Sequence, residues 1–107
     1  IEADGSVYPC DFYVLDDYRL GNINTDGFAD IAAARKKIGF IEKSFYVHED
    51  CKSCTWYSLC KGGCRRDRDD FTDAPPGKNY FCSAYKDFFA YAYERLLEVA
   101  DAIKSGR

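Results

Sequence analysis

The six cysteines are the residues of this chain best suited to chemistry. Four of them lie in the stretch CKSCTWYSLCKGGC, residues 51–64, with the spacing C-x2-C-x5-C-x3-C, while Cys10 and Cys82 stand far from it in the sequence. Six cysteines allow three interpretations, namely disulfides, a zinc site or an iron–sulfur centre. Disulfides are typical of extracellular proteins, and nothing in the composition indicates secretion. The clustered spacing therefore favours metal ligation.

The spacing alone does not assign all four clustered cysteines to one centre. A C-x2-C pair is a common half-site for both zinc and iron–sulfur clusters, because a turn or helix start points both thiolates the same way. Cys54 and Cys60 would lie about 120° apart on a straight helix, so the chain must bend between them to share a centre. Cys60 and Cys64 would share a helical face, but Gly62-Gly63 disfavours a helix there. Whether Cys64 binds the same centre as the other three clustered cysteines stays open.

The cysteine count also bears on the kind of metal site. Zinc sites usually combine two pairs of ligands, whereas here one C-x2-C pair is accompanied by single cysteines. His48, the one histidine, is interpreted as a surface or capping residue rather than a ligand. Six cysteines supply one four-thiolate site with two left over. That remainder suits a fragment of a longer protein better than a complete one.

Basic and glycine residues follow the cysteine stretch. The arginines alternate with aspartates, which predicts a solvated loop; the alternative is that they balance the charge of a metal centre. Gly62 and Gly63 are expected to bring backbone N–H groups near sulfur. Trp56 and Tyr57 are expected to pack around the site. The alternating charged residues are Arg65, Arg66, Asp67, Arg68, Asp69 and Asp70.

The N-terminal third is predicted to contain the strands. Residues 1–15 resemble the remnant of a β-hairpin, with SVYPC and DFYVL as strand segments and Asp4-Gly5 as a tight turn. The strand before that turn would be only about three residues long, and the chain has no methionine, so we expect a fragment. Residues 16–27 are predicted to form a loop. Residues 29–39 are predicted to form a helix that ends at Gly39.

The remaining elements are expected to position the cysteines. Asp50 is predicted to N-cap a short helix carrying Cys51 and Cys54, and Gly62-Gly63 to end it. Residues 67–81 are predicted to form a loop. A long helix is expected from Cys82 onward, either packed on its own domain or facing another domain with its surplus aromatics Tyr91 and Tyr93. Its apolar stripe comprises Tyr85, Phe88, Phe89, Ala92, Leu96, Val99, Ala100 and Ile103.

Length and charge narrow the class of protein. A chain of 107 residues with 47% hydrophobic and 31% charged residues predicts one small α+β domain. A net charge of −3 and a pI near 5.1 argue against a nucleic-acid partner. No apolar run approaches the roughly 18 residues that a membrane span requires. We therefore expect neither nucleic acid nor membrane among the partners.

At this point a family resemblance is evident. GSVYPCDFYVLDDYRLGNI, followed by CKSCTWYSLCKGGCRRDR and a late YFC, closely resembles the SPASM domain, the C-terminal auxiliary-cluster region of radical S-adenosylmethionine enzymes. Within that group the chain is most similar to the anaerobic sulfatase-maturating enzymes. Gly5 and Cys10 match the family's G-x4-C element, residues 51–64 match its middle, and Cys82 matches its last cysteine. The resemblance spans residues 2–82 and weakens over the C-terminal helix.

The resemblance implies two auxiliary [4Fe-4S] clusters. By matching position, the ligands of a complete cluster would be Cys51, Cys54, Cys60 and Cys82. Cys10 and Cys64 would belong to a partial second cluster, whose other two cysteines would lie upstream of Ile1. Residues 1–82 would then be an N-terminally truncated SPASM domain, and residues 83–107 a C-terminal helix packing on it.

The resemblance also implies an activity for the parent protein. Such an enzyme oxidises a Cys or Ser of its target to formylglycine, with auxiliary clusters serving in electron transfer and peptide binding. S-adenosylmethionine would be bound by a missing N-terminal barrel, which would be this chain's partner along with a sulfatase or other peptide substrate. The expected location is the cytoplasm. Alternatives are a SPASM domain of another peptide-modifying enzyme, or a zinc-binding structural or interaction module, zinc being a possible substitute for the cluster.

No catalytic residue is assigned to this chain. The sequence contains no evident nucleophile–base pair and no glycine-rich phosphate loop. The C-x3-C-x2-C motif that starts radical chemistry in the family is absent, since Cys60 and Cys64 supply its first spacing but position 67 is Asp. No residue is assigned to an organic cofactor either. We expect the chain by itself to bind a cluster without being an enzyme.

Overall fold

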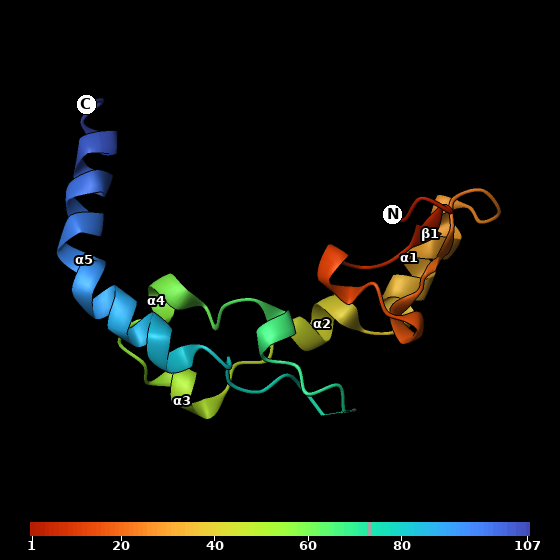
Figure 1. Cartoon of the computed structure of the whole chain (residues 1–107), viewed down its shortest axis with the longest axis horizontal. Coiled ribbons are helices and arrows are strands. Elements are labelled where there is room, and N and C mark those ends of the chain that lie inside the picture. The colour runs from red at the N-terminus through yellow and green to blue at the C-terminus, as the bar shows by residue number, and fades with distance from the viewer. Residues whose placement is uncertain (73) are drawn as a thin grey trace. The chain divides into compact units, whose positions relative to one another are not determined.

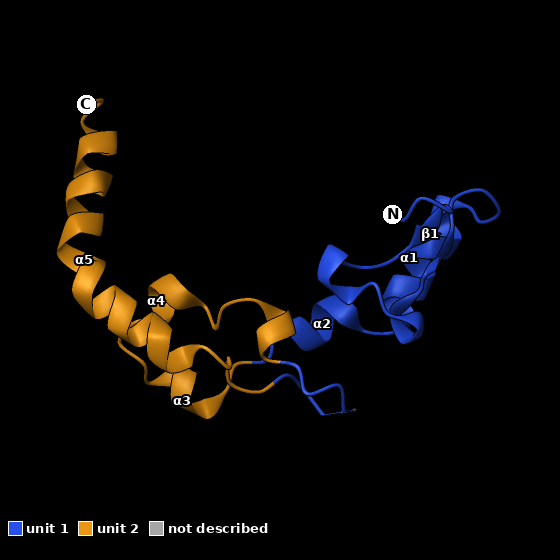
Figure 2. Ribbon diagram, viewed as in Figure 1, with its two compact units in different colours: residues 1–46, 69–76 blue, residues 47–68, 77–107 orange. Residues whose placement is uncertain are grey.

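The computed structural model describes residues 1–72 and 74–107 of the chain. It consists of two compact units, shown in Figure 2. Unit 1 comprises residues 1–46 and 69–76, and unit 2 comprises residues 47–68 and 77–107. Each unit is a set of residues that contact one another in space. The predicted domain boundary at residue 82 rests instead on the cysteine pattern of the family. That domain boundary stays a prediction.

Unit 1 contains a two-stranded antiparallel sheet. Strand β1, Ser6–Val7, pairs with β2, Gly21–Asn22, so that Ser6 lies opposite Asn22. The prediction that residues 11–15 are a strand segment of the hairpin is wrong, because Asp11–Tyr13 form a 3-10 helix. Pro9 explains the difference: it has no N–H to donate to a ladder and ends the first strand early. The partner strand comes instead from the segment predicted as a loop.

Two helices follow the sheet in unit 1 (Figure 1). Helix α1, Phe28–Lys37, confirms the helix predicted over residues 29–39, with its bounds shifted by one or two residues. Gly39 has φ +62°, in the left-handed region, and stops α1 as expected. The chain does not become a loop there, since α2, Phe40–Ser44, begins at the next residue.

The core of unit 1 is an aromatic cluster around Tyr13, whose side chain is only 1% exposed. Its ring lies edge-on to Tyr18 and Phe40 at centroid distances of 4.8 and 4.9 Å, and 6.2 Å from Phe71. The Tyr13 hydroxyl donates a hydrogen bond of 2.9 Å to Asp69 Oδ2. The tyrosine thus packs an apolar ring while its polar end has a partner, and it ties residues 69–71 to the N-terminal segment.

The described secondary-structure elements of unit 2 are helices. It contains α3, Glu49–Lys52, α4, Tyr57–Cys60, a 3-10 helix at Arg65–Asp67 and the long helix α5, Cys82–Lys104. Figure 1 shows α3 and α4 near the first turns of α5. The long C-terminal helix confirms the prediction made from the apolar stripe. Together with the small sheet of unit 1, these helices give the small α+β fold that the sequence predicts.

The helix predicted to carry two cysteines is shorter than expected. His48, not Asp50, is its N-cap, and His48 Nδ1 accepts a hydrogen bond of 3.1 Å from the Asp50 backbone N–H. The Asp50 carboxylate instead accepts from Lys78 Nζ at 3.0 Å. Cys51 lies within α3, but Cys54 lies beyond its end, because the helix stops after Lys52. The predicted cap was wrong because a distant lysine engages the carboxylate.

Helix α5 packs on its own unit near its start and exposes apolar side chains along its length. The Phe89 and Tyr93 rings lie 6.3 and 5.4 Å from the Trp56 ring. Tyr91 is 91% exposed and Ile103 is 71% exposed. None of the described helices combines the length and apolar character that a membrane crossing requires.

Candidate metal centre

Four cysteines from separate segments line one small cavity of unit 2. Cys51 lies on α3, Cys54 in the turn that follows, Cys60 at the last position of α4, and Cys82 at the first position of α5. These are the four cysteines for which the family resemblance implies a complete cluster. The other lining residues are Trp56, Tyr57, Gly62, Tyr85, Lys86 and Phe89.

The bend required between Cys54 and Cys60 comes from two successive turns. The Cys54 N–H donates to the Cys51 carbonyl at 3.3 Å, and the Tyr57 N–H donates to the Cys54 carbonyl at 3.2 Å. Helix α4 then begins at Tyr57 and ends at Cys60. Because the chain changes direction between the two cysteines, both can face the same cavity.

The chain leaves α4 through three consecutive residues in the left-handed region. Lys61, Gly62 and Gly63 have φ values of 54°, 85° and 68°. A Cβ placed on Gly63 would lie 2.5 Å from Asn79 Nδ2 and 3.2 Å from the Tyr85 ring. Glycine is therefore required at position 63 by backbone conformation and by space. Gly62 lines the cavity, and the approach of its backbone N–H to sulfur stays a prediction.

Asn79 positions Cys82 and was missed by the sequence analysis. Its side chain is only 4% exposed, and its Nδ2 donates to the Gly62 carbonyl at 3.1 Å. Its Oδ1 accepts from the Phe81 N–H at 2.8 Å, directly before α5 begins. Asn79 thus ties the start of α5 to the turn after α4. Asparagine commonly hydrogen-bonds to the backbone two residues ahead, so its place just before a predicted helix was the available signal.

The electrostatics of the cavity reflect the gathering of the thiols. Burial raises the pKa of the Cys51 thiol, and the nearby Cys82, Cys54 and Cys60 raise it further, as does Asp50. Each of these effects disfavours a thiolate at Cys51 when no cation is present. A bound metal reverses the balance, because thiolates are the ligands and a cation stabilises them.

The donor set fits an iron–sulfur cluster better than a single ion. Among residues 1–72 and 74–107, no three His, Cys, Asp or Glu side chains are grouped closely enough to hold one metal ion. Four thiolates around zinc must converge to about 2.3 Å from one atom. In a four-iron cluster each cysteine binds a different iron, so the sulfurs stand farther apart around a shared cavity. The arrangement around this cavity suits the second case, and His48 is engaged as a helix cap.

The two remaining cysteines lie outside this cavity's lining. Cys64 is exposed and precedes the 3-10 helix of unit 2. Cys10 belongs to unit 1, where its Sγ lies 3.4 Å from Asp11 Oδ1 in a hydrogen bond. All six cysteines are free thiols in the structure. The assignment of Cys10 and Cys64 to a second cluster stays a prediction.

The arginine-rich segment differs from the solvated loop that was predicted. Arg65, Arg66 and Arg68 are half-buried, and the segment forms a short 3-10 helix. The Arg68 side chain packs against Gly62: a Cβ on that glycine would lie 3.5 Å from Arg68 Cδ. The alternation of charges therefore did not predict exposure, and for Arg68 the reason is that its aliphatic stem packs against Gly62.

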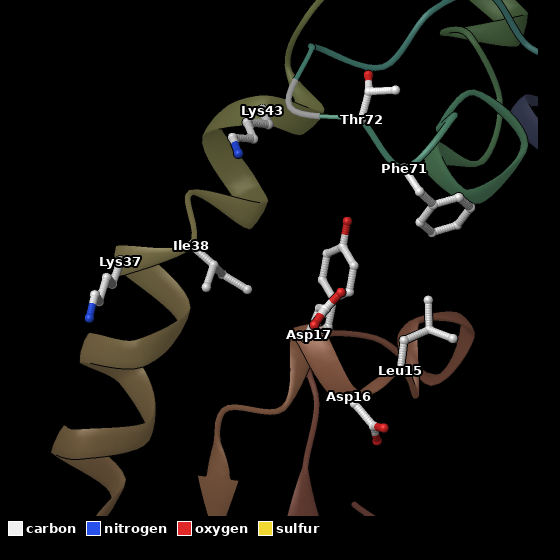
Figure 3. Close-up of a pocket in the computed structure, with 9 residues that line it drawn as sticks. Leu15, Asp16, Asp17, Lys37, Ile38, Lys43, Phe71 and Thr72 are labelled. Atoms are coloured by element: carbon white, nitrogen blue, oxygen red, sulfur yellow. The ribbon is translucent and has the colours of Figure 1, made fainter.

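Unit 1 contains a larger open cavity of about 650 Å³ that the sequence analysis did not predict. Figure 3 shows Lys37 of α1, the following Ile38 and Lys43 of α2 on one side, and the 3-10 helix Asp16–Tyr18 with its two aspartates on the other. Its lining mixes ammonium and carboxylate groups and contains no cysteine. Its lining therefore offers no thiolate ligands, unlike that of the four-cysteine cavity. The lining is completed by Leu15, Tyr18, Phe71 and Thr72.

Comparison with known proteins relates the chain to sulfatase-maturating enzymes. It is 55% identical over 104 residues to a cysteine-type anaerobic sulfatase-maturating enzyme of Clostridium perfringens strain 13, covering 97% of this chain and 28% of that protein. It is 31% identical over 93 residues to a serine-type enzyme of Bacteroides thetaiotaomicron, covering 85% of this chain and 22% of that protein. The chain thus spans between a fifth and a third of the length of these relatives.

Solved structures give the same relationship in three dimensions. A structure of native anSMEcpe with bound AdoMet and Kp18Cys peptide matches with a TM-score of 0.84 and 54% identity, covering 94% of this chain and 28% of that chain. The sequence pattern of SPASM, described as an iron–sulfur cluster-binding domain, matches residues 1–55, half of the chain. The chain therefore belongs to the SPASM family of iron–sulfur cluster-binding domains.

Proposed function

We propose that this chain holds one [4Fe-4S] cluster on Cys51, Cys54, Cys60 and Cys82. The observation that carries the proposal is that these four cysteines, brought from three helices and a turn, line one cavity. Membership of an iron–sulfur family supports the kind of metal. When bound, such a cluster supplies one-electron transfer.

The residues around the cysteines suit this role. Trp56, Tyr57, Tyr85 and Phe89 line the cavity with aromatic surface that limits access of water. A dry surrounding helps to set the potential of a cluster and protects its sulfides. The left-handed turn at Gly62-Gly63 brings the backbone to the cavity without a side chain in the way.

We propose further that the chain acts as the auxiliary-cluster part of a cysteine-type anaerobic sulfatase-maturating enzyme. Identity is 55% to a cysteine-type relative and 31% to a serine-type relative, which favours a cysteine in the target. In the whole protein, a radical S-adenosylmethionine barrel would oxidise that residue to formylglycine in the cytoplasm. The bound AdoMet and peptide of the related solved structure support such partners.

Within that protein the second cluster would use Cys10 and Cys64. We propose that both residues are ligands whose remaining partners belong to a preceding segment. The domain would then comprise residues 1–82, and α5 would complete it from residue 83 onward. The family pattern, in which Gly5 and Cys10 form the G-x4-C element, supports this assignment.

Anaerobic reconstitution of the 107-residue chain tests the first proposal. The reduced chain should take up about four iron and four sulfide per molecule, because one complete set of ligands is present. Cys82→Ala should abolish uptake, whereas Cys64→Ala, a matched change in the same unit, should leave it unchanged. Iron and acid-labile sulfide are counted, and the cluster is identified by electron paramagnetic resonance after reduction.

Two outcomes would contradict the proposal. Uptake of about one zinc without sulfide would favour a structural zinc module. Uptake that survives Cys82→Ala but is lost in Cys64→Ala would show that the ligand set is wrong.

A further inference from the structure

The four-cysteine cavity combines aromatic walls with a single charged side chain. Among the described lining residues, Lys86 is the one that carries a charge. Four thiolates around a [4Fe-4S] core with a charge of 2+ leave a net charge of about −2. Such a charge beside low-dielectric aromatic surface interacts strongly with any nearby cation. The charge of Lys86 therefore contributes to the electrostatic energy of a cluster bound in this cavity.

Helix geometry places Lys86 beside the ligand Cys82. The two residues are four apart on α5, so they lie on one face, with Cβ atoms about 6 Å apart. Lys86 is exposed as a whole residue while also lining the cavity. This combination is typical of a lysine whose aliphatic stem covers apolar surface and whose ammonium reaches water.

A second lysine stands near the same two ligands. Lys78 Nζ lies 3.0 Å from Asp50 Oδ2, and Asp50 directly precedes Cys51 in the chain. The Asp50 carboxylate raises the pKa of Lys78, and Cys82 and Cys51 raise it further, which places the ammonium within electrostatic range of both thiols. The Lys78–Asp50 pair is neutral as a unit. Lys86 adds a further positive charge beside Cys82, and in addition to Lys78 it acts electrostatically on Asp50, lowering the pKa of that carboxyl group.

We propose that Lys86 raises the reduction potential of the cluster, while the Lys78–Asp50 ion pair keeps the Asp50 carboxylate from lowering it. The inference rests on the cluster proposed above for these four cysteines. Uptake of one electron changes the net charge from about −2 to about −3, so a nearby ammonium stabilises the reduced form more than the oxidised form. Lys86 acts on the cluster through the charge of its ammonium group and does not bind iron as a ligand.

Potentiometric titration of the reconstituted chain, followed by electron paramagnetic resonance, tests this role. Lys86→Gln removes the charge and keeps the length of the side chain. We expect the ratio of reduced to oxidised cluster at a fixed potential to fall by roughly threefold to tenfold, where tenfold corresponds to about 59 mV for one electron. Lys86→Arg should stay near the wild-type potential, because it keeps the charge.

The same helix supplies the control. Lys104 ends α5, roughly 33 Å along the helix axis from Cys82. That separation is well beyond the Debye length of about 8 Å at physiological salt, so Lys104→Gln should leave the potential unchanged. The effect of Lys86→Gln should also shrink when the salt concentration is raised to about 1 M, since Lys86 is exposed to solvent.

For the Lys78–Asp50 ion pair, we expect the two substitutions to shift the reduction potential in opposite directions. Asp50→Asn removes a negative charge beside Cys51 and should raise the potential, whereas Lys78→Gln exposes that carboxylate and should lower it. Equal potentials for Lys86→Gln and Lys104→Gln, with iron content unchanged, would overturn the role of Lys86 and leave the cluster proposal standing. A wild-type chain that takes up no iron–sulfur cluster would overturn both.

Discussion

The turn after Cys60 shows how single residues shape the candidate site. Gly62 and Gly63 adopt left-handed φ values, and the Gly62 carbonyl accepts a hydrogen bond from the buried Asn79 side chain. A side chain at position 63 would meet both Asn79 and Tyr85. The turn therefore controls two things at once, namely the exit of the chain from α4 and the contact with the start of α5.

We expect Gly63→Ala to destabilise unit 2. The left-handed conformation costs a residue with a Cβ about 1–2 kcal/mol, and the contact of 2.5 Å with Asn79 Nδ2 adds an overpacking cost of about 1–3 kcal/mol. Gly106→Ala is the matched control, because Gly106 has φ +69° but nothing within 4 Å of an added Cβ. The free energy of unfolding in urea should fall clearly more for Gly63→Ala. Equal losses would mean that the Asn79 contact is relieved without cost.

At the scale of elements, helix α5 contributes Cys82 to the cavity that Cys51, Cys54 and Cys60 also line. Its first residue is Cys82, and the next turns place Tyr85, Lys86 and Phe89 along the lining. Phe89 and Tyr93 contact the Trp56 ring, so the segment between α3 and α4 packs on the same helix. The packing of α5 therefore positions a ligand as well as burying apolar surface.

We expect Phe89→Ala to lower the free energy of unfolding by about 1–3 kcal/mol, because it removes a half-buried ring that packs on Trp56. Tyr91→Ala on the same helix should change it by less than about 0.5 kcal/mol, because that side chain is 91% exposed. Trp56 is the one tryptophan of the chain, so its fluorescence in urea reports directly on unit 2. A comparable loss in both variants would indicate that the Trp56–Phe89 contact does not stabilise the unit.

At the scale of the whole molecule, the chain contains the four cysteines that we propose as ligands of one cluster and two cysteines beyond them. The chain spans 28% of the length of the Clostridium perfringens relative, so such a protein has room for further ligands. Two thiolates do not complete a four-iron cluster, which takes about four protein ligands. This is why the proposed second cluster depends on residues outside the chain.

A longer chain that adds the preceding segment of a maturase, with its two expected cysteines, should bind about eight iron per molecule instead of about four. Combined Cys10→Ala and Cys64→Ala changes in that longer chain should return the count to about four, leaving the cluster of Cys51, Cys54, Cys60 and Cys82. Iron and sulfide counts measure both. A longer chain that still binds about four iron before any substitution would count against a second auxiliary cluster.

The sequence by itself determined the features that depend on local spacing. The apolar stripe from Cys82 onward predicted α5, and helix formers ending at Gly39 predicted α1, because helical periodicity and stop signals act within a few residues. The cysteine types and their C-x2-C start pointed to metal, since ligand chemistry is carried by the residues themselves. The family pattern then singled out Cys51, Cys54, Cys60 and Cys82 as one ligand set.

Tertiary structure decided what depends on residues far apart in the chain. It paired Ser6–Val7 with Gly21–Asn22, which lies in a segment predicted as a loop, and it replaced the Asp50 cap by an ion pair with Lys78. It also brought Cys82 to the cavity of Cys51, Cys54 and Cys60 while leaving Cys64 outside the lining. The physical reason is that side-chain contacts such as Asn79 to Gly62 join segments 17 residues apart, which no local pattern encodes.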